Sequence, residues 1–246
     1  MKNTKLLFIY GLLGFFSLAV SAQGLEEILI KHEKAIGTDK GTISSAVING
    51  YSFRGTMEVP FKLYVENGKV RYESSGQNKR PMIQIYDGQK GWILSPRSPD
   101  PEELTGRQSW MIQHRANIGS PLTSWREYIN RLSLVGTEKL EGVDVYKIKM
   151  KDRDAIVEYY IDKKSYLLLR QIRLIQQNGE ELKMLTIYKN YKVVDGFTLA
   201  FNIETKPEGG ELARGSRMGG RGGGIQLIEE LKLNVPVDDK LFQFQK

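Results

Sequence analysis

Apolar and polar residues alternate along most of the chain, and short turn signals separate the alternating runs. The clearest signals are Asn67-Gly68, Asp87-Gly88, Glu141-Gly142 and Asp195-Gly196, pairs that favour the backbone of tight hairpins. Hairpin follows hairpin from residue 42 onward. The pattern therefore predicts an antiparallel meander of about five strands, then an interruption, then about six or seven more.

The later strands carry their apolar residues on one side only. Phe197, Leu199, Phe201 and Ile203 share one face of a predicted strand, and a similar alternation continues from Ile225. One apolar face and one wet face are typical of a curved sheet around an interior. The fold class predicted here is mainly β, within the α+β class.

Three segments have helical spacing instead. Residues 25–38 form an amphipathic pattern that places His32 on the apolar stripe, where we expect a core residue. Residues 102–116 and 121–131 interrupt the strands, and Ser120-Pro121 is a fair start for the second of these helices. The expected layout is thus helix, strands, two helices, strands.

Residues 1–22 have the features of a cleavable signal peptide. Lys2 and Lys5 precede an apolar run, and small residues end at Ala22. We expect a mature domain of residues 23–246, exported and soluble. The chain contains no Cys, which excludes both a disulfide framework and a Cys-linked lipid anchor. Loss of Lys2 and Lys5 lowers the formal charge from +7 to +5, a mild basic excess.

A loop rich in glycine and arginine, residues 207–224, precedes the last predicted strand. It lacks the Lys-Ser or Lys-Thr of a P-loop and does not open a helix. Because an exported protein has little nucleic acid to meet, no nucleic-acid partner is expected. The loop is interpreted as a flexible connector; the alternative is that its arginines contact lipid phosphate or an acidic partner.

Candidate catalytic chemistry is sparse. The chain has 2 His and no Cys, and His114 is interpreted as structural. Asp152 and Asp154 lie in a predicted turn without the further oxygen ligands of a calcium loop. We therefore expect no enzyme activity, no metal and no cofactor.

Large apolar side chains gather around the helical interruption. Each taken singly is interpreted as plain core, but together they suggest a cavity between sheet and helices that admits an acyl chain. The candidates for this cavity and its lid are Phe61, Trp92, Trp110, Met111, Leu122 and Trp125.

Seven segments in their order resemble the LolA-like outer-membrane lipoprotein-sorting proteins. They are "ILIKHEKAIG", "IYDGQKGW", "SPL", "VGTEKLEGVDVYKIKM", "YYIDKKSYLLLRQ", "YKVVDGFTLAFNIE" and "LKLNVPVDDKLF". The resemblance implies one half-barrel domain over residues 23–246: a curved antiparallel sheet forming an incomplete β-barrel, with an N-terminal helix and a helical lid. The long Gly-Arg loop departs from the family pattern.

The resemblance also implies a function and partners. It implies a soluble periplasmic carrier, expected as a monomer, that holds the acyl chains of lipoproteins or other lipids. An inner-membrane complex would load such a carrier and an outer-membrane receptor would unload it. In the family an arginine on an early strand holds the lid closed, for which Arg54 or Arg71 is the candidate, with Arg54 preferred for its place on the first strand.

Two other functions remain open. The same fold serves envelope modules that bind another protein and sense stress, without carrying lipid. A hydrolase is the third alternative, but it requires a convergent polar site that the sequence does not show.

Overall fold

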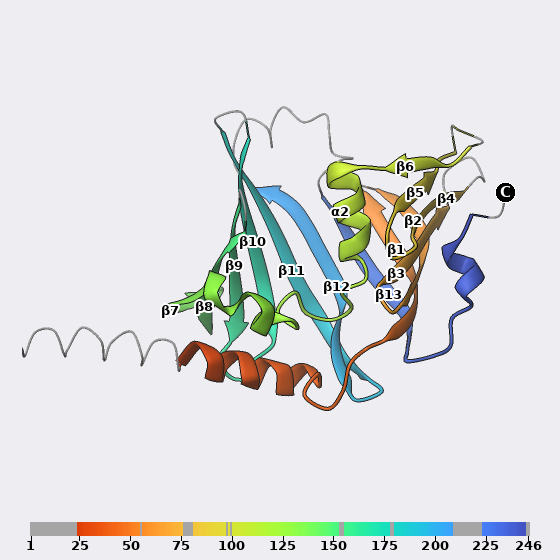
Figure 1. The fold of residues 1–246 in the computed structure, drawn as a ribbon. Coiled ribbons are helices and arrows are strands. Elements are labelled where there is room, and N and C mark those ends of the chain that lie inside the picture. The colour runs from red at the N-terminus through yellow and green to blue at the C-terminus, as the bar shows by residue number, and fades with distance from the viewer. Residues whose placement is uncertain are drawn as a thin grey trace, which may run out of the picture.

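The computed structural model describes residues 24–54, 56–75, 81–96, 98, 100–152, 155–177, 180–208 and 223–244. The predicted signal peptide, residues 1–22, and the centre of the predicted Gly-Arg loop, residues 209–222, lie outside the described residues. The described strands form one 13-stranded antiparallel sheet that curves without closing into a barrel (Figure 1).

Six strands precede the helical interruption and seven follow it. The first group comprises β1 (Ser45–Arg54), β2 (Met57–Glu66), β3 (Lys69–Ser75), β4 (Pro81–Tyr86), β5 (Gly91–Leu94) and β6 (Glu102–Leu104). The second comprises β7 (Leu132–Leu140), β8 (Val143–Asp152), β9 (Ala155–Asp162), β10 (Leu168–Gln177), β11 (Glu180–Val194), β12 (Phe197–Glu208) and β13 (Gly224–Leu233). The predicted curved antiparallel sheet is therefore confirmed.

The last strand joins the two halves of the sheet. The order β6-β5-β4-β3-β2-β1-β13-β12-β11-β10-β9-β8-β7 places β13 between β1 and β12. The β13 backbone leaves no room for a side chain at Gly50 of β1, because a Cβ there would lie 2.1 Å from the Leu227 carbonyl oxygen. Thr205 of β12 pairs with Gly224 of β13, so the Gly-Arg segment does connect two paired strands.

Positive φ angles confirm several of the predicted tight turns. Asn67 and Gly68 have φ angles of 47° and 82° between β2 and β3. Glu141 and Gly142, with φ angles of 50° and 89°, form the matching turn between β7 and β8. Such angles suit the type I′ turn, whose twist fits that of the flanking strands.

The helical segments differ in part from the predictions. The N-terminal helix covers residues 24–36, close to the predicted 25–38. The predicted helix 102–116 was wrong at its start, because Glu102–Leu104 pair with β5 as β6, and α2 (Gly106–His114) begins only afterwards. The predicted helix 121–131 is a run of turns followed by the 3-10 helix η1 (Trp125–Arg131). A further 3-10 helix, η2 (Asp239–Phe242), lies near the C-terminus.

Residues 105–131, termed here the lid segment, link the two edge strands of the sheet. They run from β6 at one edge to β7 at the other and pass over the concave face, where α2 and η1 lie (Figure 1). One apolar cluster lies under α2, against β1 to β3, β12 and β13. A second lies under the N-terminal helix and η1, against β7 to β10. The concave face is thus covered in two separate places.

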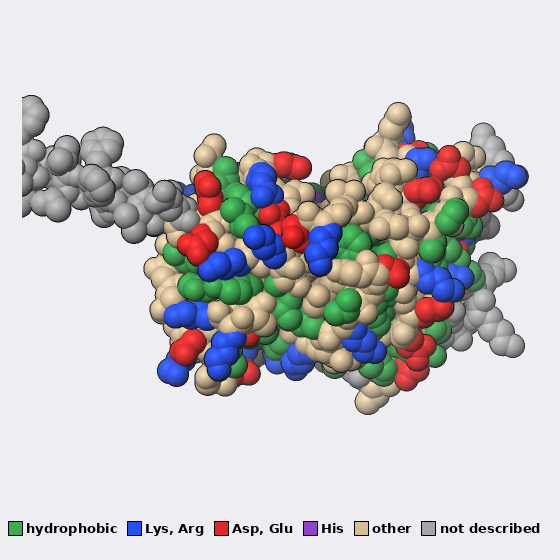
Figure 2. Space-filling model, turned by 90° about the horizontal axis from the view of Figure 1, so that it is seen from below, with side chains coloured by type: hydrophobic (Ala, Val, Ile, Leu, Met, Phe, Trp, Pro, Cys, Tyr) green, Lys and Arg blue, Asp and Glu red, His purple; other side chains and the backbone are tan. Residues whose placement is uncertain are grey.

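The surface seen from below carries both signs of charge. In this view, on the side of the N-terminal helix, basic and acidic side chains are interspersed with apolar ones (Figure 2). The basic excess of the sequence therefore does not form a single positive patch on this face. Among the described residues, no helix is both long enough and apolar enough to span a membrane.

Candidate functional site

The first half of the lid segment packs closely on the sheet at one point. Ile112 of α2 is 1% exposed and faces Gly91 of β5. A Cβ on Gly91 would lie 3.3 Å from Ile112 Cγ2 and 3.2 Å from Leu104 Cβ, so the missing side chain lets α2 settle against β5. Elsewhere α2 is more open: Met111 is 51% exposed, and no side chain caps the N-terminus of the helix.

Two adjoining cavities lie between the lid segment and the concave face. The larger has a volume of about 420 Å³ and is termed here the Trp110 cavity. The smaller has a volume of about 250 Å³ and is termed the Phe61 cavity. Both are lined by His114 and Arg115 on the lid side and by Ile203 and Gln226 on the sheet side. The two cavities therefore adjoin. The volume of the larger one lies within the range usual for small-molecule sites, about 300–1,000 Å³.

The two cavities differ in their linings. The Phe61 cavity is mainly apolar, with Ile48, Phe61, Leu63, Ile118, Leu199, Ala200, Ile203, Ile228 and Leu231 around it. The Trp110 cavity has further polar groups in its aromatic and aliphatic walls, namely Ser52 and Thr205. A lining that changes from apolar to polar suits a ligand with a tail and a head.

The second half of the lid segment is fixed by a buried histidine. His32 of the N-terminal helix is 0% exposed; its Nδ1 lies 2.7 Å from the Tyr166 carbonyl oxygen and its Nε2 lies 2.7 Å from Ser120 Oγ. Because a carbonyl only accepts, Nδ1 carries the proton and Nε2 accepts from Ser120. Burial lowers the pKa of His32, against the opposing effect of the Tyr166 carbonyl. Neutral His32 thus ties the helix, the lid segment and the β9–β10 turn together.

Further contacts hold the same half of the lid segment. Arg126 of η1 forms two hydrogen bonds with the Glu33 carboxylate of the N-terminal helix, one of them 2.9 Å long. Tyr128 donates a hydrogen bond of 2.6 Å to the Pro121 carbonyl oxygen, and burial raises its pKa to about 12. The lid segment therefore has a firmly attached second half and a first half that packs mainly through Ile112.

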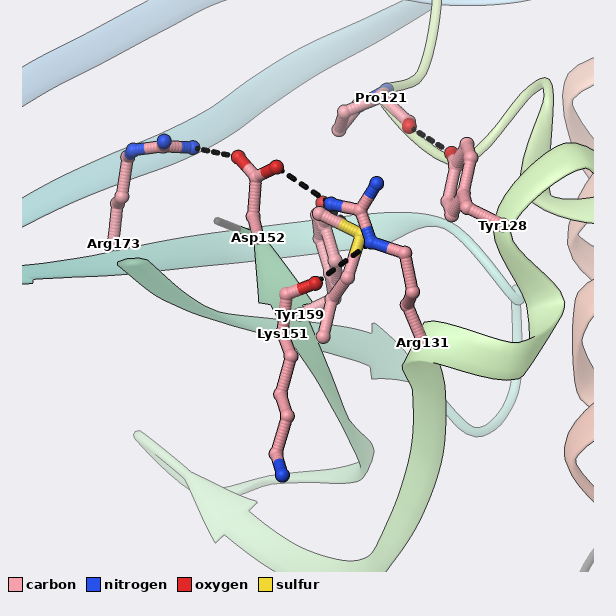
Figure 3. Close-up of polar contacts among 8 residues, drawn as sticks. Pro121, Tyr128, Arg131, Lys151, Asp152, Tyr159 and Arg173 are labelled. Carbon is pink, nitrogen blue, oxygen red and sulfur yellow. Dashed lines mark hydrogen bonds and ion pairs between the residues drawn. The ribbon is translucent and has the colours of Figure 1, made fainter. Parts of the chain in front are cut away.

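A charged cluster lies where η1 meets the sheet (Figure 3). Arg131 donates 2.8 Å to the Lys151 carbonyl oxygen and 2.6 Å to Asp152, whose other oxygen accepts from Arg173 at 2.9 Å. Burial raises the pKa of Asp152, but the hydrogen bonds and charges of Arg173 and Arg131 outweigh this and hold it below the usual value. Asp152, placed by the sequence in a predicted turn, is thus ion-paired with two arginines at the end of β8; Asp154 lies outside the described residues.

The predicted cavity and lid residues separate into three groups. Phe61 lines the smaller cavity, and Trp110 and Met111 line the larger one. Leu122 and Trp125 belong to the lid segment but are packed into the second apolar cluster. Trp92 alternates with Gly91 along β5, so it lies on the face of the sheet away from α2.

The two arginine candidates lie away from the described lid contacts. Arg71 of β3 donates 2.9 Å to the Leu241 carbonyl oxygen and 2.5 Å to Glu73, so it holds η2 on the outer face of the sheet. This contact directs Arg71 away from the lid segment. Arg54 ends β1, where it pairs with Met57, and its side chain lies outside the described residues.

Most residues of the two linings were not among the predicted site residues, and two of these, His114 and Arg115, lie on the lid segment and line both cavities. The ring centre of His114 lies 3.7 Å from that of Trp110, and the two rings are tilted by 34°. Arg115 also lines both, with its guanidinium 4.0 Å from the centre of the Tyr72 ring. The signal in the sequence was their place at the end of a helix that also carries Trp110. Within the described part of the chain, no group of three or more His, Asp or Glu residues is arranged to hold a metal ion.

Comparison with known proteins finds similarity in structure but not in sequence. No family model and no curated protein sequence matches the chain. A LolA superfamily protein from Nitrosomonas europaea is similar over 89% of this chain and 97% of its own, with a TM-score of 0.58 and 16% identity. A DUF1329 family protein from Desulfovibrio piger matches over 87% and 96%, with a TM-score of 0.59 and 13% identity.

A third solved structure has a similar fold. An outer membrane lipoprotein-sorting protein domain from Vibrio parahaemolyticus matches over 88% of this chain and 94% of its own, with a TM-score of 0.54 and 12% identity. The resemblance inferred from the sequence is confirmed at the level of the fold, and the chain has a LolA-like fold.

Proposed function

We propose that the mature chain is a soluble periplasmic carrier that binds acyl chains of lipoproteins or other lipids beneath its lid segment. The observation that carries the proposal is the pair of adjoining cavities on the concave face, of which the Phe61 cavity is mainly apolar. Each methylene buried there contributes about 0.8 kcal/mol to binding. The proposal involves no covalent chemistry, because binding and release are sufficient for a carrier.

Loading and release require the cover of the cavities to move. The first half of the lid segment is suited to this, because glycines with positive φ angles flank it: Gly106 at 54° and Gly119 at 106°. The second half, held by His32 and Glu33, stays in place as the base of the movement. In this proposal an inner-membrane complex loads the carrier and an outer-membrane receptor takes over its cargo.

The first experiment is native mass spectrometry of the protein, expressed with its leader and purified from the periplasm without detergent. Extraction of bound lipid follows. An adduct of one acyl-bearing molecule per chain supports the carrier and names its cargo class. An apo mass, with no uptake of an added diacylated lipopeptide, would overturn the proposal. The mass of the chain also tests cleavage after Ala22, and the mass of the native protein tests the predicted monomer.

Trp110→Glu tests the cavity directly. Trp110 is half-buried at the cavity wall, so a charged side chain there is expected to weaken acyl binding about tenfold or more while the protein stays folded. Binding is measured by titration with a lipopeptide and folding by circular dichroism. Trp92→Glu, on the other face of the sheet, is the matched control for the effect of charge on binding. Unchanged binding by folded Trp110→Glu would contradict the assignment.

A protein-interaction module of the same fold is the second candidate. It is favoured by β7, an edge strand with neighbours on one side only among the described strands, on which Val135 is 56% exposed. An exposed edge can add a strand from another chain. Cross-linking in whole cells from a cysteine placed at Val135 tests this candidate, since the chain has no cysteine of its own. A specific membrane-protein adduct, with an apo mass for the purified protein, would favour it over the carrier.

A further inference from the structure

A polar side chain of the sheet lies where the two cavities adjoin. Gln226 of β13 lines both the Trp110 cavity and the Phe61 cavity. Its cross-strand partners are Ser52 of β1 and Ile203 of β12, which also line the Trp110 cavity. Directly opposite residues of an antiparallel pair project from the same face of the sheet, with Cβ atoms about 4.5–5.5 Å apart. Ser52 and Gln226 therefore lie side by side on the concave face.

A β-bulge turns Gln226 towards the cavities. Leu231 of the same strand is buried in the first apolar cluster, and strict alternation from Leu231 would place residue 226 on the opposite face of the sheet. The residues of β1 that pair with Glu230 and Ile228 are consecutive, so Glu229 is an extra residue in β13. One extra residue reverses the alternation, and Ile228 and Gln226 then line the cavities. Bulges are frequent next to functional sites, where they redirect a side chain.

The side chains of Ser52 and Gln226 have no hydrogen-bonding partner in the described part of the chain. The Gln226 amide offers two N–H donors and a carbonyl acceptor, and the Ser52 hydroxyl can both donate and accept. By contrast, the Thr205 hydroxyl in the same cavity is hydrogen-bonded to that of Thr186 at 3.2 Å. A few polar groups in a mainly apolar pocket fix the orientation of a ligand by hydrogen bonding. Ser52 and Gln226 are therefore available to a ligand.

We infer that Ser52 and Gln226 form a neutral hydrogen-bonding subsite for the ester or amide carbonyl that links an acyl chain to the rest of the ligand. The Ser52 hydroxyl and the Gln226 amide donate to this carbonyl oxygen, and the hydrocarbon extends into the Phe61 cavity. This inference rests on the proposed function and specifies the chemical bond by which the cargo is recognised. A ligand without the carbonyl is disfavoured, because it leaves both polar groups unpaired beneath the lid segment.

The test compares lipids that differ only in this carbonyl. The mature protein, freed of lipid, is titrated with a diester lipopeptide and its diether analogue, and then with palmitoyl and hexadecyl lysophosphatidylcholine, all below their micelle concentrations. Tryptophan fluorescence and native mass spectrometry report binding. Each ester should bind about fivefold more tightly than its ether, the difference expected from one hydrogen bond. The two pairs of lipids have two chains and one chain, so the comparison does not depend on the number of chains.

Matched variants assign the preference to the two side chains. Gln226→Leu should bring the ratio of ester to ether affinity close to one, and Ser52→Ala should lower it in part. Gln226→Asn retains an amide and should keep part of the preference. Gln84→Leu is the control, because it makes the same substitution on β4, outside both linings, and should keep the wild-type ratio. Circular dichroism checks folding; if Gln226→Leu does not fold, Ser52→Ala and the comparison of lipids on the wild type still decide.

The outcomes separate this inference from the proposed function. Equal affinity of the wild type for ester and ether overturns the subsite and leaves the carrier intact. Absence of binding for all four lipids overturns the carrier itself. An ester preference that persists undiminished in both Gln226→Leu and Ser52→Ala overturns the assignment to these two residues. A preference that Gln226→Leu loses and Gln84→Leu keeps supports it.

Discussion

At the scale of single residues, His32 has a larger role than its place on an apolar stripe suggests. Its two ring nitrogens connect Tyr166 to Ser120, and Ser120 Oγ in turn accepts a hydrogen bond of 3.1 Å from the Leu122 backbone. The sequence predicted the burial of His32, because the apolar spacing of a helix requires it. It did not reveal the partners, since these lie 88 and 134 positions away and only the fold brings them together.

His32 makes stability depend on pH near neutrality. Its folded pKa is depressed by burial, so the unfolded state takes up the proton first as the pH falls below about 6.5. The contribution of neutral His32 to the stability of the fold is therefore present above that pH and is lost below it. Urea midpoints at pH 7.5 and pH 5.5 should show this loss for the wild type and a smaller one for His32→Gln. His114→Gln is the control, and an identical pH dependence in His32→Gln would contradict the assignment.

For the aromatic candidates too, the sequence does not show what each side chain faces in the fold. Composition and position selected Phe61 and Trp110, which line the cavities, together with Trp92, which lies on the other face of the sheet. In a strand the face of each side chain depends on register, and a shift by one residue reverses it. Register is set by pairing with other strands, so a single aromatic residue does not reveal which side it faces.

At the scale of elements, the strands were easier to predict than the lid segment. Turn pairs such as Asn67-Gly68 fix a hairpin locally, because their backbone angles suit little else. Glu102–Leu104 have no such local signal; they form β6 only because β5 offers a free edge. The 3-10 form of η1 likewise follows from tertiary contacts, among them the burial of Trp125 and the pairing of Arg126 with Glu33.

Asp152 is predicted to fasten the lid segment to β8. Asp152→Asn should lower the free energy of unfolding by about 1–2 kcal/mol at pH 7, because two guanidinium partners lose an anion in a partly exposed site. With a folded pKa below the usual value, the stability due to Asp152 is present above about pH 4 and is lost as the pH falls through the folded pKa. The variant should thus lose less stability than the wild type between pH 5 and pH 3.

The matched control for this element is Asp144→Asn. Asp144 pairs with Lys139 at 3.4 Å, but both side chains are more than half exposed, so little change is expected. Urea titrations of the three proteins provide the comparison. Equal midpoints for Asp152→Asn and the wild type at pH 7 would contradict the role of the cluster.

At the scale of the whole molecule, the sheet is continuous only through its last strand. β1 pairs with β13 on one side, and β12 pairs with β13 on the other. The strands β1 to β6 and β7 to β12 are each a meander of neighbours, whereas the connection between them is made by the end of the chain. The sequence predicted the meanders but not the pairing of β13 with β1, because long-range pairing leaves no local pattern.

A chain that ends after Glu208 should therefore fail to fold cooperatively. It keeps twelve of the thirteen strands but loses β13, along with Leu231 and Leu233 of the first apolar cluster. Thermal unfolding followed by circular dichroism should show a broad transition in place of a sharp one. A chain that ends after Gln243 and so keeps β13 is the control; a sharp transition in the shorter chain would contradict the role given to β13.

The path of the lid segment also restricts the shape of what can enter. The lid segment is joined covalently to both edges of the sheet, so it crosses the hollow as a strap fixed at both ends. A thin, flexible chain can slide beneath such a strap from the side, whereas a folded domain cannot pass beneath it. A folded body attached to a chain that enters in this way stays outside the hollow, exposed to the solvent.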